Sequence, residues 1–346
     1  MKRFVGIVLL TPSIAAAQNW SFGGFIDAYY GHSFNQTKKF ERNFTTQPVR
    51  MNEANINLAF ADVKYDAESV RGKLTIQGGN SVSRNYAGES PVDIKALQEA
   101  FVGFKVTDKT WIDMGIYLGH IGMESWISRD NYTYTRSLQL DYVPYYASGI
   151  RVEHEIDATQ KVQFHILNGW QNITRANSAK DFGFQYIKKM NPKLQFTYNN
   201  FLGDEELASM KPRFRSYHDF IFHFNLSSRW NLLTSFDLGH QSMQDKNGVV
   251  FWFATSTVAQ YKLNEKEAMA FRIEYYNDRH QANVVTNTFN GFQVLAASVN
   301  YDRQIYHRLR WRTELRGFQS KDKIYRKKND LSLTDMFLVT SLSVSL

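Results

Sequence analysis

The chain of 346 residues contains no cysteine and only 6 prolines. The missing cysteine excludes disulfide bonds, thiolate metal sites and a cysteine nucleophile. No stretch of ~18 consecutive apolar residues occurs, which excludes a helical membrane protein. Few prolines suit a chain that lies mostly in β-ladders, because each strand residue needs its N–H. Hydrophobic residues make up 43% of the chain and aromatic residues 15%, which argues against disorder.

The first residues have the pattern of an export signal. Lys2 and Arg3 precede an apolar run over 4–10, and alanines at 15–17 follow it. This order is typical of a secretory signal peptide with an A-x-A cleavage site. We therefore expect residues 1–17 to be removed and residues 18–346 to form the mature protein outside the inner membrane.

Most of the mature chain alternates between apolar and polar residues. In the segment 269–275, Met269, Phe271, Ile273 and Tyr275 share one face. Such runs reach ~10–13 residues, longer than ordinary globular strands and long enough to cross a bilayer at a tilt. Many of them end in Trp or Tyr, as in the aromatic girdles of outer-membrane barrels. The pattern predicts an all-β fold, a single transmembrane antiparallel β-barrel. A soluble sandwich or propeller with an aromatic core is the alternative.

The connections alternate strictly between short polar turns and long loops. This asymmetry is typical of barrels with short periplasmic turns and long external loops. The even count of about 16 strands places both termini on the periplasmic side. The pattern shows no second domain and no plug domain before the first strand. The predicted strands lie near 20–32, 51–65, 69–80, 96–106, 110–120, 146–156, 160–169, 180–189, 193–202, 214–226, 229–241, 249–262, 266–276, 291–302, 306–317 and 333–346.

One predicted strand, 306–317, carries a row of charges on a single face. Each arginine would cost ~2–4 kcal/mol on the lipid face near the midplane, so the row should face the lumen. The inward residues lean basic, which predicts weak anion preference. Alternatively, opposite charges pair across strands and leave little net field. The predicted pore-lining residues are Arg308, Arg310, Arg312, Glu314, Arg316, Arg272 and Arg151. Further inward candidates are basic (Arg71, Lys73, Lys105, Lys161) and acidic (Glu99, Asp113, Glu153, Glu155, Asp219, Asp237, Glu274).

The longest connection, 121–145, is the third long loop. Long connections in compact proteins are usually functional. In porins of 16 strands the third loop commonly folds inward and narrows the pore, and we expect the same here. A surface loop packed by its own aromatics is the alternative. The predicted constriction residues are Glu124, Arg129, Asp130, Arg136 and Asp141.

This loop also carries a family resemblance. The sequence around it reads WIDMGIYLGHIGMESWISRDNYTYTRSLQLDYVPYYASGIRV, and GGFIDAYYGHSFN, NGWQNI and FLGDEE with YHDF occur elsewhere. Together these segments resemble the OmpL-like β-barrel porin-2 family of Gram-negative outer membranes, especially its Bacteroidetes members. The resemblance spans roughly residues 20–220, and the later strands fit by pattern alone. It implies a barrel porin and provides no functional residues to carry over.

Other chemistries find little support. His218 and His223 lie five residues apart on a predicted strand and so point to opposite faces, where they cannot share a metal ion. No glycine-rich phosphate loop, no catalytic motif and no nucleic-acid-binding fold is evident, so we expect no cofactor, no enzymatic activity and no nucleic-acid partner.

The sequence thus predicts an outer-membrane porin, a passive diffusion channel for small hydrophilic solutes. A substrate-specific channel with aromatics stacking on a sugar or organic acid remains open, as does an enzyme or adhesion barrel with an occluded lumen. Expected partners are the lipid bilayer, lipopolysaccharide and the outer-membrane assembly machinery. The outward faces suit lipid contacts and the contacts of a homotrimer alike.

Overall fold

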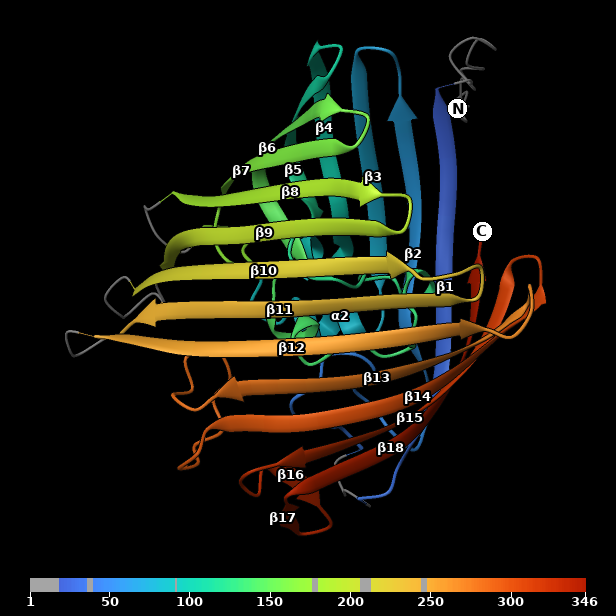
Figure 1. The fold of residues 1–346 in the computed structure, drawn as a ribbon, viewed down its shortest axis with the longest axis vertical. Coiled ribbons are helices and arrows are strands. Elements are labelled where there is room, and N and C mark those ends of the chain that lie inside the picture. The colour runs from blue at the N-terminus through green and yellow to red at the C-terminus, as the bar shows by residue number, and fades with distance from the viewer. Residues whose placement is uncertain (1–18, 36–39, 91, 176–179, 206–212, 244–247) are drawn as a thin grey trace, which may run out of the picture.

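The computed structural model describes residues 19–35, 40–90, 92–175, 180–205, 213–243 and 248–346, so the expected signal peptide lies outside the described residues. Sixteen strands form one closed antiparallel barrel (Figure 1). They are β1 (Trp20–Ser33), β2 (Ala54–Asp66), β3 (Val70–Gly78), β4 (Leu97–Thr107), β5 (Thr110–Leu118), β6 (Tyr146–Asp157), β7 (Gln160–Leu167), β8 (Asp181–Asn191), β9 (Leu194–Glu205), β10 (Arg213–Asn225), β11 (Trp230–Ser242), β12 (Val249–Lys262), β13 (Glu267–Asp278), β14 (Phe292–Tyr306), β15 (Leu309–Ser320) and β18 (Thr334–Ser345).

The predicted barrel and its number of strands are confirmed. The largest difference concerns the predicted strand 306–317: β14 continues to Tyr306, and β15 begins only at Leu309. Arg308 therefore lies in the turn between these strands and not on a strand, where alternation would have pointed it into the lumen. The shift follows from a register irregularity between Gln304 and Tyr306, which the alternation pattern does not reveal.

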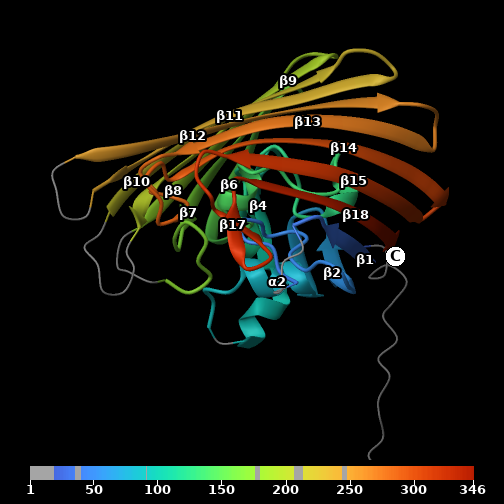
Figure 2. The same cartoon turned by 90° about the horizontal axis from the view of Figure 1, so that it is seen from below.

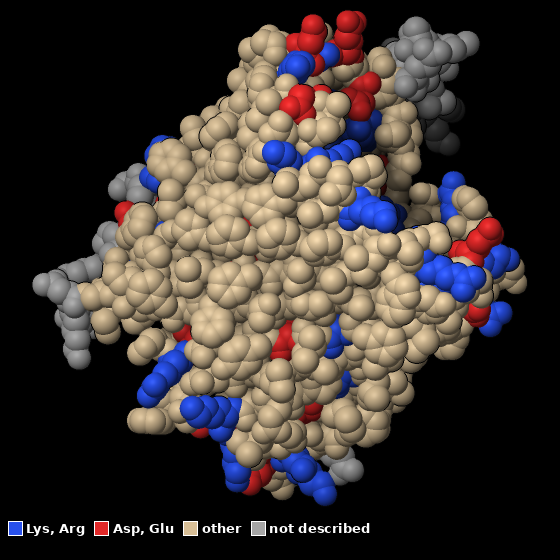
Figure 3. All heavy atoms as spheres, in the orientation of Figure 1, with Lys and Arg blue, Asp and Glu red and all other residues tan. Residues whose placement is uncertain are grey.

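Alternation sorts each strand into a lipid face and an inner face. On β13, Ile273 is 59% exposed, whereas its neighbours Arg272 and Glu274 are each 2% exposed. Exposed large apolar side chains recur on the outer faces of the other strands, for example Phe22, Phe164 and Phe251. In Figure 3 charged residues are sparse over the middle of the visible wall and gather toward its rims. This apolar band is the surface that a bilayer requires.

The barrel closes where its first strand pairs with its last, with Phe25 opposite Ser345. β1 begins and β18 ends at the end of the barrel that carries the short turns, and the long loops lie at the other end (Figure 1). The front strands cross the back strands steeply in this view, as expected when the strands of a barrel tilt against its axis.

Several long loops contain structure that the sequence patterns did not predict. The loop after β3 holds the short helix α2 (Asn80–Asn85) and the 3-10 turn η1 (Val92–Ala96). The third loop holds η2 (Ser128–Asp130) and η3 (Leu140–Tyr142), and the last loop holds the hairpin β16 (Tyr325–Lys327) and β17 (Asp330–Ser332). No helix in the described part of the chain has the length and apolar character to span a membrane. Figure 2 shows α2 and β17 lying under the arch of the long strands.

Candidate functional site

The third loop, residues 119–145, lies inside the barrel. The Gly122 N–H donates to Asp219 Oδ2 on β10 (2.8 Å), and Ser128 Oγ donates to Asp27 Oδ2 on β1 (3.0 Å). β1 and β10 stand on opposite sides of the ring of strands. The loop therefore crosses the lumen instead of lying on the outer surface.

The arginines of β15 bind the backbone of this loop. An irregular loop has carbonyl groups that no helix or ladder satisfies, and each needs a donor when buried. Guanidinium groups supply several donors in a fixed fork, so one side chain serves more than one acceptor. The bonds run from Arg310 to the Arg129 carbonyl (2.7 Å), from Arg312 to the Asn131 carbonyl (2.7 Å) and to the Ser128 carbonyl, and from Arg316 to the Arg136 carbonyl (2.6 Å).

Carboxylates of the wall accept the N–H groups of the same loop. The Thr135 N–H donates to Glu314 Oε2 (2.7 Å), and the Leu138 N–H donates to Glu274 Oε2 (2.5 Å). Arg272 lies between these acids and donates to the Thr135 carbonyl (2.6 Å). The backbone of the loop thus finds donors and acceptors on the charged face formed by β13 and β15, and this network fixes its position.

The predicted pore-lining residues occupy different environments. Arg312, Arg316 and Arg272 are at most 2% exposed because the loop covers them, and Glu314 is covered with them. Arg310 is only partly buried and borders a cavity. Arg308 is exposed in its turn. The row on β15 is thus mainly an anchor for the loop, and a pore-lining role stays a prediction for its members.

The predicted constriction residues divide into a buried set and an exposed pair. Glu124 pairs with Arg272 (3.2 Å) and is buried. Arg136 lies 3.6 Å from Asp141, and both side chains are 1% exposed. Its guanidinium also lies over the rings of Trp126 and Tyr145, 4.9 and 3.7 Å from their centroids.

Arg129 and Asp130 form the exposed pair at the tip of the loop. Their side chains are 33% and 50% exposed, and 3.6 Å separates Arg129 Nε from Asp130 Oδ1. Of the five predicted residues, these two can therefore contact a passing solute.

Two cavities meet at the tip of the loop. The first, of about 520 Å³, lies between the tip and the turn ends of β12–β15, and the second, of about 350 Å³, lies between the tip and β8–β12. Asp130, Asn131 and Tyr132 line both. The first cavity is lined by four cations and four acids, whereas amides and apolar side chains dominate the second. The cations are Arg129, Lys262, Lys266 and Arg310, and the acids are Asp130, Glu265, Glu267 and Asp302.

On the opposite wall, the inward charges are paired. Asp113 accepts from Arg71 (2.7 Å) and from Arg151 (2.6 Å), and Lys161 pairs with Glu153 (3.0 Å). Lys73 and Glu99 form a further pair. Arg151, a predicted pore-lining residue, thus shares the carboxylate of Asp113 with Arg71. These contacts are the cross-strand pairing that the sequence left open as the alternative to anion preference.

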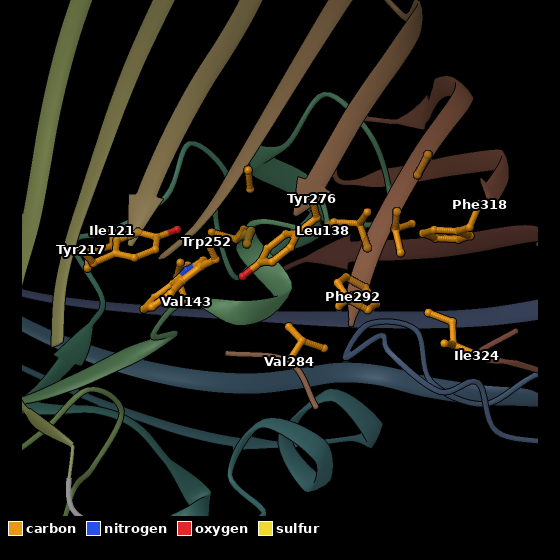
Figure 4. Close-up of a cluster of buried hydrophobic side chains, with 14 of the residues drawn as sticks. Ile121, Leu138, Val143, Tyr217, Trp252, Tyr276, Val284, Phe292, Phe318 and Ile324 are labelled. Carbon is orange, nitrogen blue, oxygen red and sulfur yellow. The ribbon is translucent and has the colours of Figure 1, made fainter. Parts of the chain in front are cut away.

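The third loop also packs against the wall and the outer loops through apolar contacts. Ile121, Leu138 and Val143 lie in one buried cluster with Tyr217 of β10 and Tyr276 of β13 (Figure 4). The same cluster includes Val284, Phe292 and Ile324, which lie in or beside the seventh and eighth loops. Packed side chains therefore occupy part of the external half of the lumen.

His120 is buried at the start of the third loop. Its ring stacks on His165 with 4.2 Å between centroids, and its Nε2–H donates to the Asn200 carbonyl (2.9 Å). Burial lowers the pKa of His120 to about 4, so the ring is neutral at pH 7. Within the described ranges no group of three or more His, Asp or Glu side chains is placed to hold a metal ion.

Comparison with known families decides the identity. A family model described as "Putative beta-barrel porin-2, OmpL-like" matches residues 19–346. The chain belongs to this family. It is an outer-membrane porin, and the resemblance noted over residues 20–220 extends through the last strand of the barrel. No curated protein matches this porin.

Solved structures share the fold of this porin at low identity. The anion-selective porin from Comamonas acidovorans matches with a TM-score of 0.62 and 8% identity, covering 94% of this chain and 99% of that one. OmpT of Vibrio cholerae matches with a TM-score of 0.63, 10% identity and coverage of 94% and 97%. The channel DcaP of Acinetobacter baumannii matches with a TM-score of 0.62 and 10% identity, covering 94% of this chain and 97% of that one. Such likeness supports the barrel fold alone.

Sequence reasoning did not find the second cavity. Its lining comes from β8–β12, where Ile187, Ile221 and Leu233 interrupt inward faces that a water-filled lumen should make polar. Apolar residues at inward positions were the available signal, but they emerge only once the register of five strands is known.

Proposed function

We propose that this porin is a passive diffusion channel for small hydrophilic solutes, with its narrowest part at the tip of the third loop. The observation that carries the proposal is the position of Arg129 and Asp130, exposed in the lumen between two cavities. The wall fixes the loop, so the aperture has a defined size. Solutes small enough to pass the tip diffuse down their gradient, and no energy coupling is required.

The first cavity gives the channel a weak preference for anions. Lys262, Lys266 and Arg310 line it. Two of its acids are engaged elsewhere, because Asp302 pairs with Arg312 (2.7 Å) and Glu267 with Arg303 (3.8 Å). Arg312 and Arg303 each add a positive charge next to the lining residues, so the net charge around the cavity is positive. The paired charges of the opposite wall contribute little net field, so the preference is weak.

Planar-bilayer recording of the refolded mature chain tests this function. Stepwise channel openings are expected, and in a KCl gradient the reversal potential should shift toward the chloride equilibrium potential. A shift toward the potassium equilibrium potential would overturn the anion preference while leaving the channel intact.

A barrel with an occluded lumen is the second candidate. The close packing of the external half of the lumen, where Tyr134 and Leu138 are 1% exposed, favours it. In that case the barrel anchors another activity in the membrane. Absence of conductance from a correctly folded barrel would support this candidate and contradict the diffusion channel.

Four further features belong to the same proposal. Residues 1–17 act as the export signal and 18–346 as the mature barrel, which the residue pattern of the N-terminus supports. The protein has no enzymatic activity, in line with its porin family.

The proposed partners are those of an outer-membrane barrel. The assembly machinery inserts the barrel, and the exposed apolar band contacts lipid and lipopolysaccharide. This porin assembles as a homotrimer. A trimer form is named for one similar structure, OmpT of Vibrio cholerae.

A further inference from the structure

The second cavity combines an apolar floor with a polar rim. Strand register places Ile187 opposite Thr197 and Thr197 opposite Ile221, in one row across β8, β9 and β10. The next row places Leu233 opposite His223 and also opposite Val258. Apolar side chains of β8, β10, β11 and β12 thus gather on one side of the cavity, with Thr197 between Ile187 and Ile221.

Uncharged polar groups surround this patch. Gln195 and Gln185 line the cavity from β9 and β8, and Asn131 lines it from the loop. The Gln195 side chain makes no hydrogen bond to any other described residue, so both its donor and its acceptor are available to a solute. The Gln185 amide nitrogen donates to the His120 carbonyl (3.0 Å), and this bond orients its side chain.

An aromatic side chain closes the cavity from the loop side. Tyr132 Oη lies 2.7 Å from His223 Nε2, and the two rings meet edge to face with 5.9 Å between centroids. This bond holds the tyrosine ring in place, and the ring lines the cavity together with the apolar floor. A rigid ring of this kind offers an apolar surface to a ligand at little entropic cost.

The charge of the cavity selects against anions. Its lining contains the carboxylates of Glu124 and Asp130 and no lysine or arginine. The Glu124 carboxylate is 2% exposed and paired with Arg272, whereas Asp130 is half exposed and can accept hydroxyl protons. A ligand for this site is therefore neutral, rich in hydroxyl groups and apolar on one face. The pyranose ring of a saccharide has this combination, with C–H groups on its faces and hydroxyl groups along its edge.

We propose that the second cavity is a binding subsite for neutral saccharides, placed beside the constriction. Its volume of about 350 Å³ falls within the usual range of small-molecule sites. The proposal rests on the diffusion-channel function and adds a solute class to it. A saccharide bound here lies next to the aperture, and this binding raises the local saccharide concentration at the aperture. The basic cavity on the other side of the loop tip serves anions, so the two solute classes approach the aperture along different walls.

Single-channel current with maltotriose as the probe tests the subsite. In the wild-type porin we expect a saturable decrease in current, which polyethylene glycol of the same hydrodynamic size does not reproduce. Leu233→Asn and Gln195→Ala should each weaken the apparent affinity about tenfold. Gln260→Ala is the matched control, because Gln260 lines the basic cavity instead. Its affinity for maltotriose should equal that of the wild type.

The failures of the two proposals are distinguishable. An open channel that shows no saturable decrease, or the same affinity in all variants, overturns the subsite and leaves the channel standing. A folded barrel without conductance overturns the channel. Calorimetry of the detergent-refolded barrel with maltotriose then decides the subsite, because binding that Leu233→Asn weakens supports it and absence of binding overturns it. The mobility shift of unheated barrels in SDS gels verifies that each variant is folded.

Discussion

Arg272 and Glu314 form a buried ion pair with 3.0 Å between Nη2 and Oε1, although β14 separates the strands that carry them. Thr135 of the third loop joins the pair: its hydroxyl accepts from the same nitrogen (2.7 Å), and its N–H donates to Glu314 Oε2 (2.7 Å). The pair therefore links the wall and the loop in one network. Because such groups are costly to bury alone, each partner depends on the others.

Glu314→Gln should loosen the third loop. The amide keeps the shape of the side chain but leaves Arg272 with one charge fewer to balance it, and breaking a buried pair costs roughly 3–5 kcal/mol. We expect a lower midpoint in urea unfolding of the refolded barrel, together with noisier single-channel current. Glu265→Gln is the control, because Glu265 is exposed in a turn. Equal midpoints for the two variants would contradict the anchoring role.

Arg312→Ala should detach the tip of the loop from β15. It removes the donors to the Ser128 and Asn131 carbonyls and leaves Asp302 without its ion-pair partner. Mean conductance should rise as the tip moves away from the lumen. Arg303→Ala serves as control, since its side chain is 57% exposed and its ion pair contributes at most about 1 kcal/mol. Unchanged conductance in Arg312→Ala would show that the tip does not limit the current.

The sequence predicted the barrel well because alternation is a local property. Each strand shows its lipid face within ~10 residues, as Phe271 and Ile273 do on β13. The inward direction of Arg312 follows from the same rule. The loop that covers Arg312 cannot be predicted from this rule. The carbonyl groups that Arg312 binds, those of Ser128 and Asn131, lie 184 and 181 residues away along the chain. A pattern confined to one strand contains no information on such contacts.

The two cavities were beyond prediction for a related reason. Ile187 and Leu233 are neighbours only through the register of the intervening strands. A slip of one residue in any of these ladders would turn one of them toward lipid. The position of Arg308 illustrates this sensitivity, since one irregularity near Gln304 moved it from a predicted strand to a turn.

Lys266→Glu should weaken the anion preference. Lys266 lines the basic cavity, and no ion pair involves its ammonium among the described residues. Reversing its charge makes the local balance more negative by two charges, so the reversal potential in a KCl gradient should move toward the potassium value. Lys193→Glu is the control, in the turn between β8 and β9. A shift of equal size in the control would assign the effect to net charge alone.

Acidification should lower the stability of the barrel through His120, which lies at the start of the third loop and binds the Asn200 carbonyl. Burial lowers the pKa of His120 to about 4, against about 6.5 in an unfolded chain. Between these values the unfolded state binds more protons, so stability falls as pH drops from about 6.5 to about 4 and then levels off. Urea unfolding midpoints across this range measure the slope. His120→Gln should flatten it, and an unchanged slope would contradict the assignment.

The absence of cysteine permits a direct test of which residues border the pore. Asp130→Cys introduces a single thiol at the tip of the loop, where the native side chain is half exposed between the two cavities. Thr135→Cys places a matched thiol on the same loop, but at a fully buried position that faces the wall. A bulky methanethiosulfonate reagent added to open channels should reduce the current of Asp130→Cys stepwise. It should leave Thr135→Cys unchanged, because the loop shields that position from water. If Asp130→Cys is modified, as mass spectrometry can verify, and the current stays constant, then the tip lies beside the conducting path and the constriction must be sought elsewhere in the lumen.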